Sequence, residues 1–241
     1  MTKEKNYFYD GLYAYNNKDY EKAINCFNEI IDKFSNSIGN AKLSETYYMR
    51  GICYAQEYSI DEALEDFNEA EKLGFDKSKI YCGRGIAYAH DGKNGEAVSN
   101  FTKAIELNGS YEEAYCRKGI AYFFDLKFDE AIINFNKAIE LNKYYDKAYY
   151  YRGLVYYNKN EYDKAFENFK KFKPNDALNY MVKLFLTSEK SINNIENLTI
   201  KYADSYFTSV IGKNIKINKS KLFKIWCYQY VLLDLLSIKN Y

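Results

Sequence analysis

Histidine, cysteine and acidic side chains are the groups in this sequence that could carry catalysis or hold a metal. The chain has a single histidine, His90, which excludes any mechanism that needs two. Its neighbour Asp91 could orient it as a general base, but adjacent residues of a helix do not face each other. We therefore interpret His90 as a surface or groove residue. The acidic residues form no catalytic pair that their spacing reveals, so no catalytic residue is predicted and the protein is not expected to be an enzyme.

The cysteines are odd in number and lack C-x-x-C spacing: Cys26, Cys53, Cys82, Cys116 and Cys227. This pattern predicts neither a disulfide framework nor a zinc site. Cys82 and Cys116 occupy equivalent places in the repeats described below, where helix axes about 8–10 Å apart exceed the Cα separation of a disulfide. We predict free thiols, no metal and a reducing, cytoplasmic location.

Two glycine-containing segments approach phosphate-binding motifs without completing them. Residues 83–87 lack the third glycine of a dinucleotide fingerprint and follow no strand, and residues 91–94 lack the frame of a phosphate loop. Gly92 and Gly95 are interpreted instead as a tight turn between two helices. No nucleotide or other cofactor is expected, and no small-molecule substrate.

The composition indicates a folded chain of one or two domains. Its 241 residues are 47% hydrophobic and 28% charged, with a formal net charge of +1. The polar, tyrosine-rich beginning predicts no secretory signal. The apolar run at 222–238 contains Lys224, Gln229 and Asp234, and is shorter than the roughly 20 apolar residues that span a bilayer. No membrane span is predicted.

A 34-residue period organises most of the chain. Five columns of one residue type recur in phase: Tyr47, Tyr81, Tyr115 and Tyr149; Gly51, Gly85, Gly119 and Gly153; Tyr54, Tyr88, Tyr122 and Tyr156; Ala63, Ala97, Ala131 and Ala165; Phe67, Phe101, Phe135 and Phe169. Within each unit the spacings of three, four and seven are helical, and short polar breaks divide the unit into two helices. Each unit is predicted to be a helical hairpin.

The column pattern Y-x-x-x-G-x-x-Y…A-x-x-x-F at this period resembles the tetratricopeptide repeat. The resemblance implies an all-α fold, a right-handed α-solenoid in which stacked helix-turn-helix repeats bury one another's faces. About six extra residues near 35–41 should lengthen the first junction. The resemblance covers residues 1–173 in five repeats, at about 4–37, 44–77, 78–111, 112–145 and 146–173.

The sequence departs from the family pattern in two ways. The turn proline of the family is absent, and we expect Gly109 or Asn142 to end a helix in the left-handed conformation instead. Basic residues also occupy a column where the family often has leucine: Arg50, Arg84, Lys118 and Arg152.

The resemblance implies a scaffold that binds an extended peptide or a helix of another protein in a concave groove. In the family, the first helix of each hairpin lines this groove. The corresponding positions here are largely apolar and aromatic: Phe8, Leu12, Tyr15, Asn16, Tyr48, Met49, Ile52, Gln56, Cys82, Gly83, Ile86, His90, Cys116, Arg117, Ile120, Phe124, Tyr150, Tyr151, Leu154 and Asn158. Packing between repeats is the alternative role for many of these rings.

One subset of the family holds the acidic carboxyl terminus of chaperones with Lys and Asn on successive first helices. The matching positions of the first repeats carry apolar residues such as Phe8, Leu12 and Met49, so chaperone-tail binding is not expected. We expect a hollow where small residues of the third repeat stand between larger ones, and Gly83→Trp is the substitution that the sequence suggests to fill it. The small residues are Cys82, Gly83, Ala87 and Ala89, and the expected flanking residues are Ile86, His90, Ile120 and Phe124.

Residues 174–241, beginning at Pro174, lack the columns and are predicted to form a degenerate helical pair and a capping helix. Trp226 and the neighbouring leucines could cap the array or form a dimer face, so a monomer and a homodimer stay open. This segment also holds a lysine-rich face for which nucleic acid or an anionic surface is a disfavoured alternative partner: Lys213, Lys216, Lys219, Lys221 and Lys224. Self-association through these helices is the other alternative function.

Overall fold

The computed structural model describes residues 3–172, and this part of the chain contains only helices and the turns between them. Contacts divide the chain into a first unit of residues 1–161 and a second unit that begins at Tyr162. The helices are α1 (Lys3–Asn16), α2 (Tyr20–Phe34), α3 (Asn40–Gln56), α4 (Ile60–Lys72), α5 (Lys77–His90), α6 (Asn94–Leu107), α7 (Glu112–Phe124), α8 (Phe128–Leu141), α9 (Asp146–Asn158) and α10 (Tyr162–Phe172).

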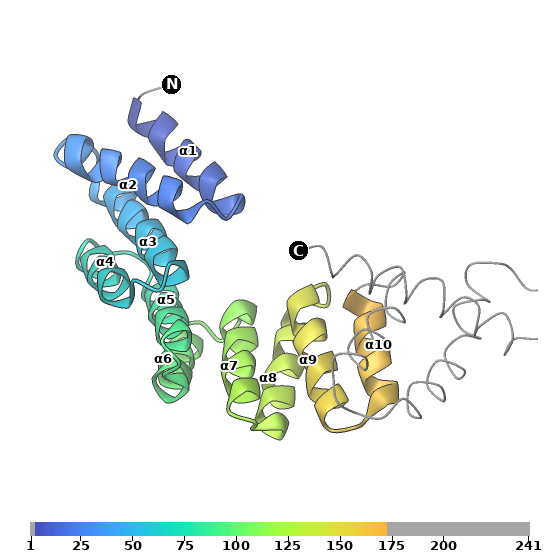
Figure 1. Cartoon of the computed structure of the whole chain (residues 1–241). Coiled ribbons are helices and arrows are strands. Elements are labelled where there is room, and N and C mark those ends of the chain that lie inside the picture. The colour runs from blue at the N-terminus through green and yellow to red at the C-terminus, as the bar shows by residue number, and fades with distance from the viewer. Residues whose placement is uncertain (1–2, 173–241) are drawn as a thin grey trace, which may run out of the picture. The chain divides into compact units, whose positions relative to one another are not determined.

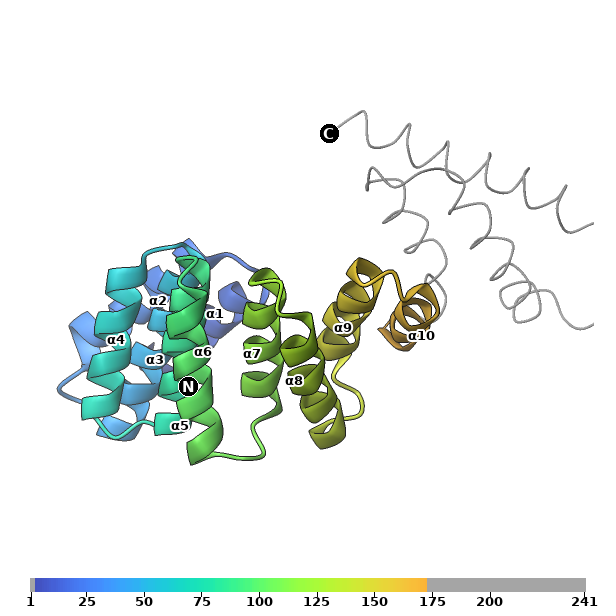
Figure 2. The ribbon, with the colours of Figure 1, turned by 90° about the horizontal axis from the view of Figure 1, so that it is seen from below.

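Helices α1 to α8 stack as four hairpins, each packed against the next (Figures 1 and 2). The second helix of one hairpin contacts the first helix of the following hairpin, and α9 continues this arrangement by packing on α8 and α7. The architecture is therefore an all-α solenoid. Helix α10 belongs to the second unit, where Ala165 and Phe169 are buried. The predicted cap at 174–241 lies outside the described residues.

The repeated glycine and phenylalanine form the core contact of each hairpin. Phe27, Phe67, Phe101 and Phe135 have no more than 1% of their surface exposed. A Cβ atom added to the glycine of the same hairpin would lie within 3 Å of this ring, as at Gly85, where the distance to Phe101 Cε1 is 2.6 Å. Glycine therefore lets the two helices approach until the ring fills the space between them.

The extra residues of the first junction are partly taken up by helix. Helix α3 has 17 residues, whereas α5, α7 and α9 have 13 or 14. The additional turn lies at its amino-terminal end, after Gly39, because the column glycine Gly51 keeps its place against Phe67. The insertion thus changes helix length without disturbing the core contact.

Three arginines of the basic column join neighbouring hairpins. Each donates from its guanidinium group to an asparagine Oδ1 on the preceding second helix: Arg50 to Asn28 at 2.6 Å, Arg84 to Asn68 at 2.7 Å, and Arg152 to Asn136 at 2.5 Å. At the junction of α6 and α7 the two positions hold Thr102 and Lys118, and Thr102 donates instead to the carbonyl oxygen of Val98. The three arginines that replace leucine therefore act as polar links between repeats.

Neither Gly109 nor Asn142 adopts the left-handed conformation, so that expectation is wrong. Among the ends of the second helices that the structure describes, Gly74 after α4 has a positive φ, of 89°. Asn142 has a φ of −140°, and Gly109 also lacks a positive φ. Positive φ recurs instead in the turn between the first and second helix of each repeat: Lys18, Tyr58, Gly92, Leu126 and Asn160. Gly92 is thus a turn glycine as predicted, whereas Gly95 lies in the first turn of α6.

Replacing Leu126 by glycine is expected to raise the free energy of unfolding by up to about 1 kcal/mol, because Leu126 has a φ of 60° and its side chain is 73% exposed. Urea denaturation would measure the change. Gly92→Leu, at the same place in the preceding turn, should have the opposite sign. A loss of stability in Leu126→Gly would contradict this account.

Candidate functional site

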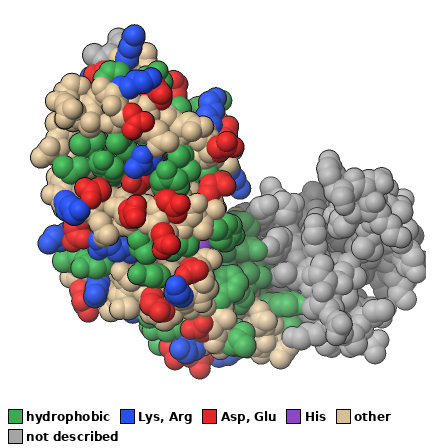
Figure 3. Space-filling model, turned by 60° about the vertical axis from the view of Figure 1, so that its left-hand side comes forward, with side chains coloured by type: hydrophobic (Ala, Val, Ile, Leu, Met, Phe, Trp, Pro, Cys, Tyr) green, Lys and Arg blue, Asp and Glu red, His purple; other side chains and the backbone are tan. Residues whose placement is uncertain are grey.

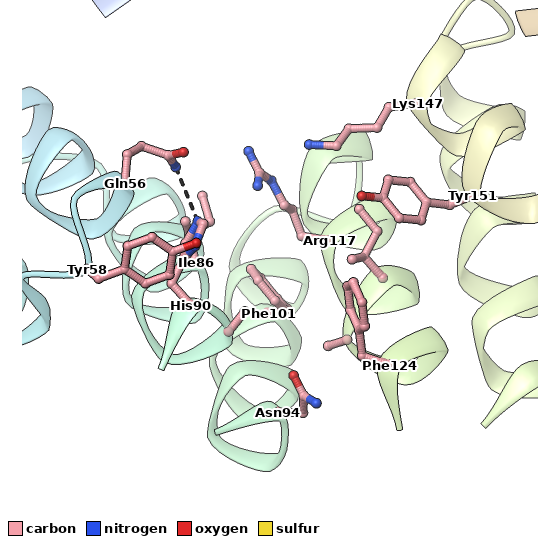
Figure 4. A pocket seen from close by; sticks show the side chains of 13 residues that line it. Gln56, Tyr58, Ile86, His90, Asn94, Phe101, Arg117, Phe124, Lys147 and Tyr151 are labelled. Atoms are coloured by element: carbon pink, nitrogen blue, oxygen red, sulfur yellow. Dashed lines mark hydrogen bonds between the residues drawn. The ribbon is translucent and has the colours of Figure 1, made fainter. Parts of the chain in front are cut away.

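A pocket of about 400 Å³ is bordered by the first helices of successive hairpins (Figure 4). Its walls come from the end of α3, from α5, α7 and α9, and from the beginning and middle of α6. In Figure 4, Gln56 and His90 enter from one side, Lys147 and Tyr151 from the other, and Arg117 stands between them. The volume lies within the usual range of ligand pockets, about 300–1,000 Å³.

Apolar side chains form the floor and the rim of the pocket. The buried Ile86 and Phe101 close the floor. At the rim, Phe124 is 64% exposed and Tyr58 is 69% exposed. Such rings at the mouth of a concave site can cover an apolar side chain of a ligand with little loss of rotamer entropy.

His90 is held by contacts within the pocket and not by a carboxylate. Its Nε2 lies 3.4 Å from Gln56 Nε2, and its ring meets the Tyr58 ring edge-on at 5.3 Å between centroids. Burial lowers the pKa of His90, and the positive charges of Arg117 and Lys147 lower it further. Asp91 Oδ2 pairs with Lys93 Nζ at 2.6 Å. His90 and Asp91 therefore do not form an acid–base pair.

Two cations from different helices face the same space. Arg117 on α7 donates from Nε and Nη2 to Glu113 Oε1, at 3.2 and 3.1 Å. Lys147 on α9 forms no hydrogen bond or ion pair with any described residue. Desolvation lowers the pKa of Lys147, and the nearby charge of Arg117 adds to this effect. The pocket thus has an apolar floor, and the two cations lie on the side opposite that floor in Figure 4.

The structure brings part of the predicted groove set together around this pocket: Gln56, Ile86, His90, Arg117, Ile120, Phe124 and Tyr151. Other members are buried in the core, namely Phe8, Ile52, Cys82, Gly83 and Cys116. Leu12, Tyr15, Tyr48, Met49, Tyr150 and Leu154 are half-buried, and Asn16 and Asn158 are exposed. Ring contacts such as Tyr48 with Phe75, stacked at 4.6 Å, show that some of these residues pack between helices.

The expected hollow exists, since Ala89 and the four predicted flanking residues line the pocket, but Gly83 does not border it. A Cβ atom at Gly83 would lie 2.8 Å from the Phe67 ring, so this glycine faces the core of the preceding hairpin. Cys82 is also buried, and burial raises the pKa of its thiol to about 12. Gly83→Trp would disrupt the core and cannot probe a groove. The hollow opens about two helical turns later, at Ala89 and His90.

Cys26, Cys53, Cys82 and Cys116 are free thiols, as predicted. Cys227 lies outside the described residues.

Besides Ala89, Phe101 and Ala121, three pocket residues with polar groups lie outside the predicted groove set: Tyr58, Asn94 and Lys147. Lys147 stands four residues before Tyr151 on α9, so helical spacing alone would have placed it on the same face. Tyr58 lies in a turn, and Asn94 is held by donating to Asp125 Oδ1 at 2.8 Å, a contact across 31 residues. No periodic signal indicates either of these two.

Family comparisons agree with the repeat architecture. Three models described as tetratricopeptide repeat match residues 8–37, 78–111 and 116–179. The chain belongs to the tetratricopeptide repeat family. A search of curated proteins found no match.

Solved structures of tetratricopeptide repeat proteins share the fold. A crystal structure of MamA is 25% identical, with a TM-score of 0.50 over 67% of this chain and 91% of that one. MamA from Desulfovibrio magneticus is 20% identical, with a TM-score of 0.52 over 71% and 94%. TTC0263, a thermophilic tetratricopeptide repeat protein of Thermus thermophilus, is 17% identical, with a TM-score of 0.61 over 84% and 98%.

Proposed function

We propose that this tetratricopeptide repeat protein is a non-catalytic scaffold that binds a peptide or helix of another protein on the face formed by its first helices. The observation that carries the proposal is the pocket, because α5, α7 and α9, three successive first helices, all contribute to it. A concave apolar site with a few polar groups is the default place for a ligand. The partner should place an apolar side chain between Phe124 and Ile86.

A surface on which charged and hydrophobic side chains alternate can distinguish one partner protein from another. Acidic and basic side chains are intermixed over the face shown in Figure 3, with hydrophobic side chains between them.

No helix in the described part is long and apolar enough to cross a membrane. Four free thiols agree with a reducing compartment, and we propose the cytoplasm. The alternatives of self-association and lysine-face binding rest on residues 174–241, outside the described part.

Peptides selected on the immobilised protein from a random displayed library should bind Phe124→Ser at least about tenfold more weakly than the unchanged protein, because Phe124 is an exposed aromatic ring at the pocket rim. Fluorescence anisotropy with the labelled peptides would measure both dissociation constants. Truncating Phe124 should leave folding intact because most of its surface faces solvent.

Ile133→Ser is the matched control, because Ile133 is 66% exposed but lies on α8, a second helix. It should bind the same peptides within about twofold of the unchanged protein. Peptides that bind Phe124→Ser normally and lose affinity for Ile133→Ser would place the binding surface on the second helices and overturn the proposal.

A further inference from the structure

We propose that the pocket binds one carboxylate of a partner peptide next to an apolar side chain, with Lys147 and Arg117 as the groups that receive the carboxylate. This inference rests on the proposed function and specifies the chemistry of the same site.

The first argument is the position of Lys147. Lys147 is half-buried and lines the pocket beside Arg117, and no carboxylate pairs with its ammonium group among the described residues. A partly desolvated cation without a partner costs free energy, since buried charges are ordinarily paired. An anion that enters the pocket would supply the missing partner and recover this cost.

The second argument is the unused part of the Arg117 guanidinium. Nε and Nη2 both donate to one oxygen of Glu113, and Nη1 has no acceptor among the described residues. A guanidinium group presents its donors in a planar fork suited to carboxylates. Nη1 of Arg117 and the ammonium of Lys147 can therefore approach one carboxylate from two helices (Figure 4).

The charge balance limits the ligand to one carboxylate. Glu113 is the acidic residue that pairs with Arg117, at 3.1 Å, and it neutralises that charge. His90 is neutral at pH 7, because burial and both cations lower its pKa from an ordinary value of 6.5. A single net positive charge remains, on Lys147. This matches one carboxylate and not a run of acidic residues, in agreement with the absent chaperone-tail clamp.

The apolar wall determines what accompanies the carboxylate. Ile86, Ile120 and Phe124 lie on the same pocket as the two cations. An aromatic or branched side chain adjacent to the carboxylate would cover them and exclude water, and exclusion of water strengthens the charged hydrogen bonds. The ligand class is therefore an apolar residue next to Asp or Glu, or an apolar residue at a free carboxyl terminus.

Two peptide pairs that differ only in charge test the inference. The acetylated and amidated hexapeptides SAFEAS and SAFQAS compare a side-chain carboxylate with its amide. Acetylated SAAF with a free carboxyl terminus and its carboxyl amide compare a terminal carboxylate with its amide. In at least one pair the acid should bind about tenfold more tightly than the amide in NMR titration, and the pair that responds identifies the source of the carboxylate.

Lys147→Met should abolish this difference between acid and amide while retaining the length of the side chain, and Lys147→Gln serves as a second variant. Neither should lower the melting temperature, because each removes an unpaired, partly desolvated cation. Lys118→Met is the matched control. Lys118 is also half-buried and desolvation lowers its pKa, but it does not line the pocket. The Lys118→Met variant should keep the full difference.

Equal binding of acid and amide, or a difference that survives in Lys147→Met, would overturn the carboxylate assignment. If such equal binding is lost in Phe124→Ser, the pocket binds apolar peptides and the proposed function stands without the carboxylate. No binding of any of the four peptides up to about 1 mM would also overturn the assignment, and the library selection would then decide the proposed function independently.

Discussion

Replacing Arg50 by methionine is expected to lower the free energy of unfolding by about 3–5 kcal/mol. Arg50 donates from Nε and Nη2 to the two carboxylate oxygens of Asp66, at 2.8 and 2.7 Å. The Asp66 side chain is only 5% exposed. Loss of the guanidinium would leave this carboxylate buried without a counter-charge and would also remove the hydrogen bond to Asn28. Urea denaturation followed by circular dichroism would measure the change.

Two further variants separate the ion pair from the other contacts of Arg50. Arg50→Met combined with Asp66→Leu should recover most of the lost stability, because no buried charge then stays unpaired. Arg84→Met should cost less than Arg50→Met, since its partner Glu71 is 28% exposed and can be solvated. A double variant no more stable than Arg50→Met would show that Arg50 acts chiefly through contacts other than Asp66.

Gly85→Ala is expected to destabilise the protein by about 1–3 kcal/mol through overpacking. The added Cβ atom would lie 2.6 Å from Cε1 and 2.7 Å from Cδ1 of Phe101. Phe101 is 1% exposed and packs between α5 and α6, so either the ring or the helices must shift to admit the added atom. Thermal and urea denaturation would both report the loss, and the same ring forms the pocket floor.

Gly95→Ala provides the control on the adjacent helix. Gly95 is an exposed residue of α6, and a Cβ atom added there would meet nothing within 4 Å. Alanine at this position should stabilise the protein by about 0.5–1 kcal/mol, because glycine loses more backbone entropy than alanine in a helix. Similar effects of the two substitutions would mean that backbone entropy, and not the contact with Phe101, governs Gly85.

The helices and their pairing could be predicted because the contacts that hold each hairpin are local and repeated. Gly85 and Phe101 are sixteen residues apart, and the same pair recurs as Gly51 with Phe67 and as Gly119 with Phe135. A close glycine–ring contact needs these residue types at this spacing, so the steric requirement can be recognised in the sequence alone. The prediction that Cys82 and Cys116 are free thiols used the same repeat geometry, because equivalent helices of neighbouring repeats lie too far apart for a disulfide.

The residue type predicted the turn at Gly92, but it did not predict the conformation of the equivalent turns in the other repeats. Lys18, Tyr58, Leu126 and Asn160 adopt positive φ although only glycine does so without strain. The tight connection between two packed helices imposes this conformation on whatever residue follows the first helix. Gly109 is the residue type that favours positive φ, but it lies in the connection between α6 and α7, where its backbone does not adopt this conformation.

The chemistry of the pocket depends on how neighbouring hairpins pack. His90, Ile120 and Phe124 were placed on the correct face from the repeat register, because each hairpin presents the same helical face. Gly83 packs on Phe67 of the preceding helix, and Arg117 pairs with Glu113 four residues earlier on α7, so both contacts are local. That Lys147 lacks a partner among the described residues depends on how α9 packs on α7 and α8. Periodicity specifies the contacts within a repeat, whereas burial and unpaired charge arise only when several repeats enclose the same space.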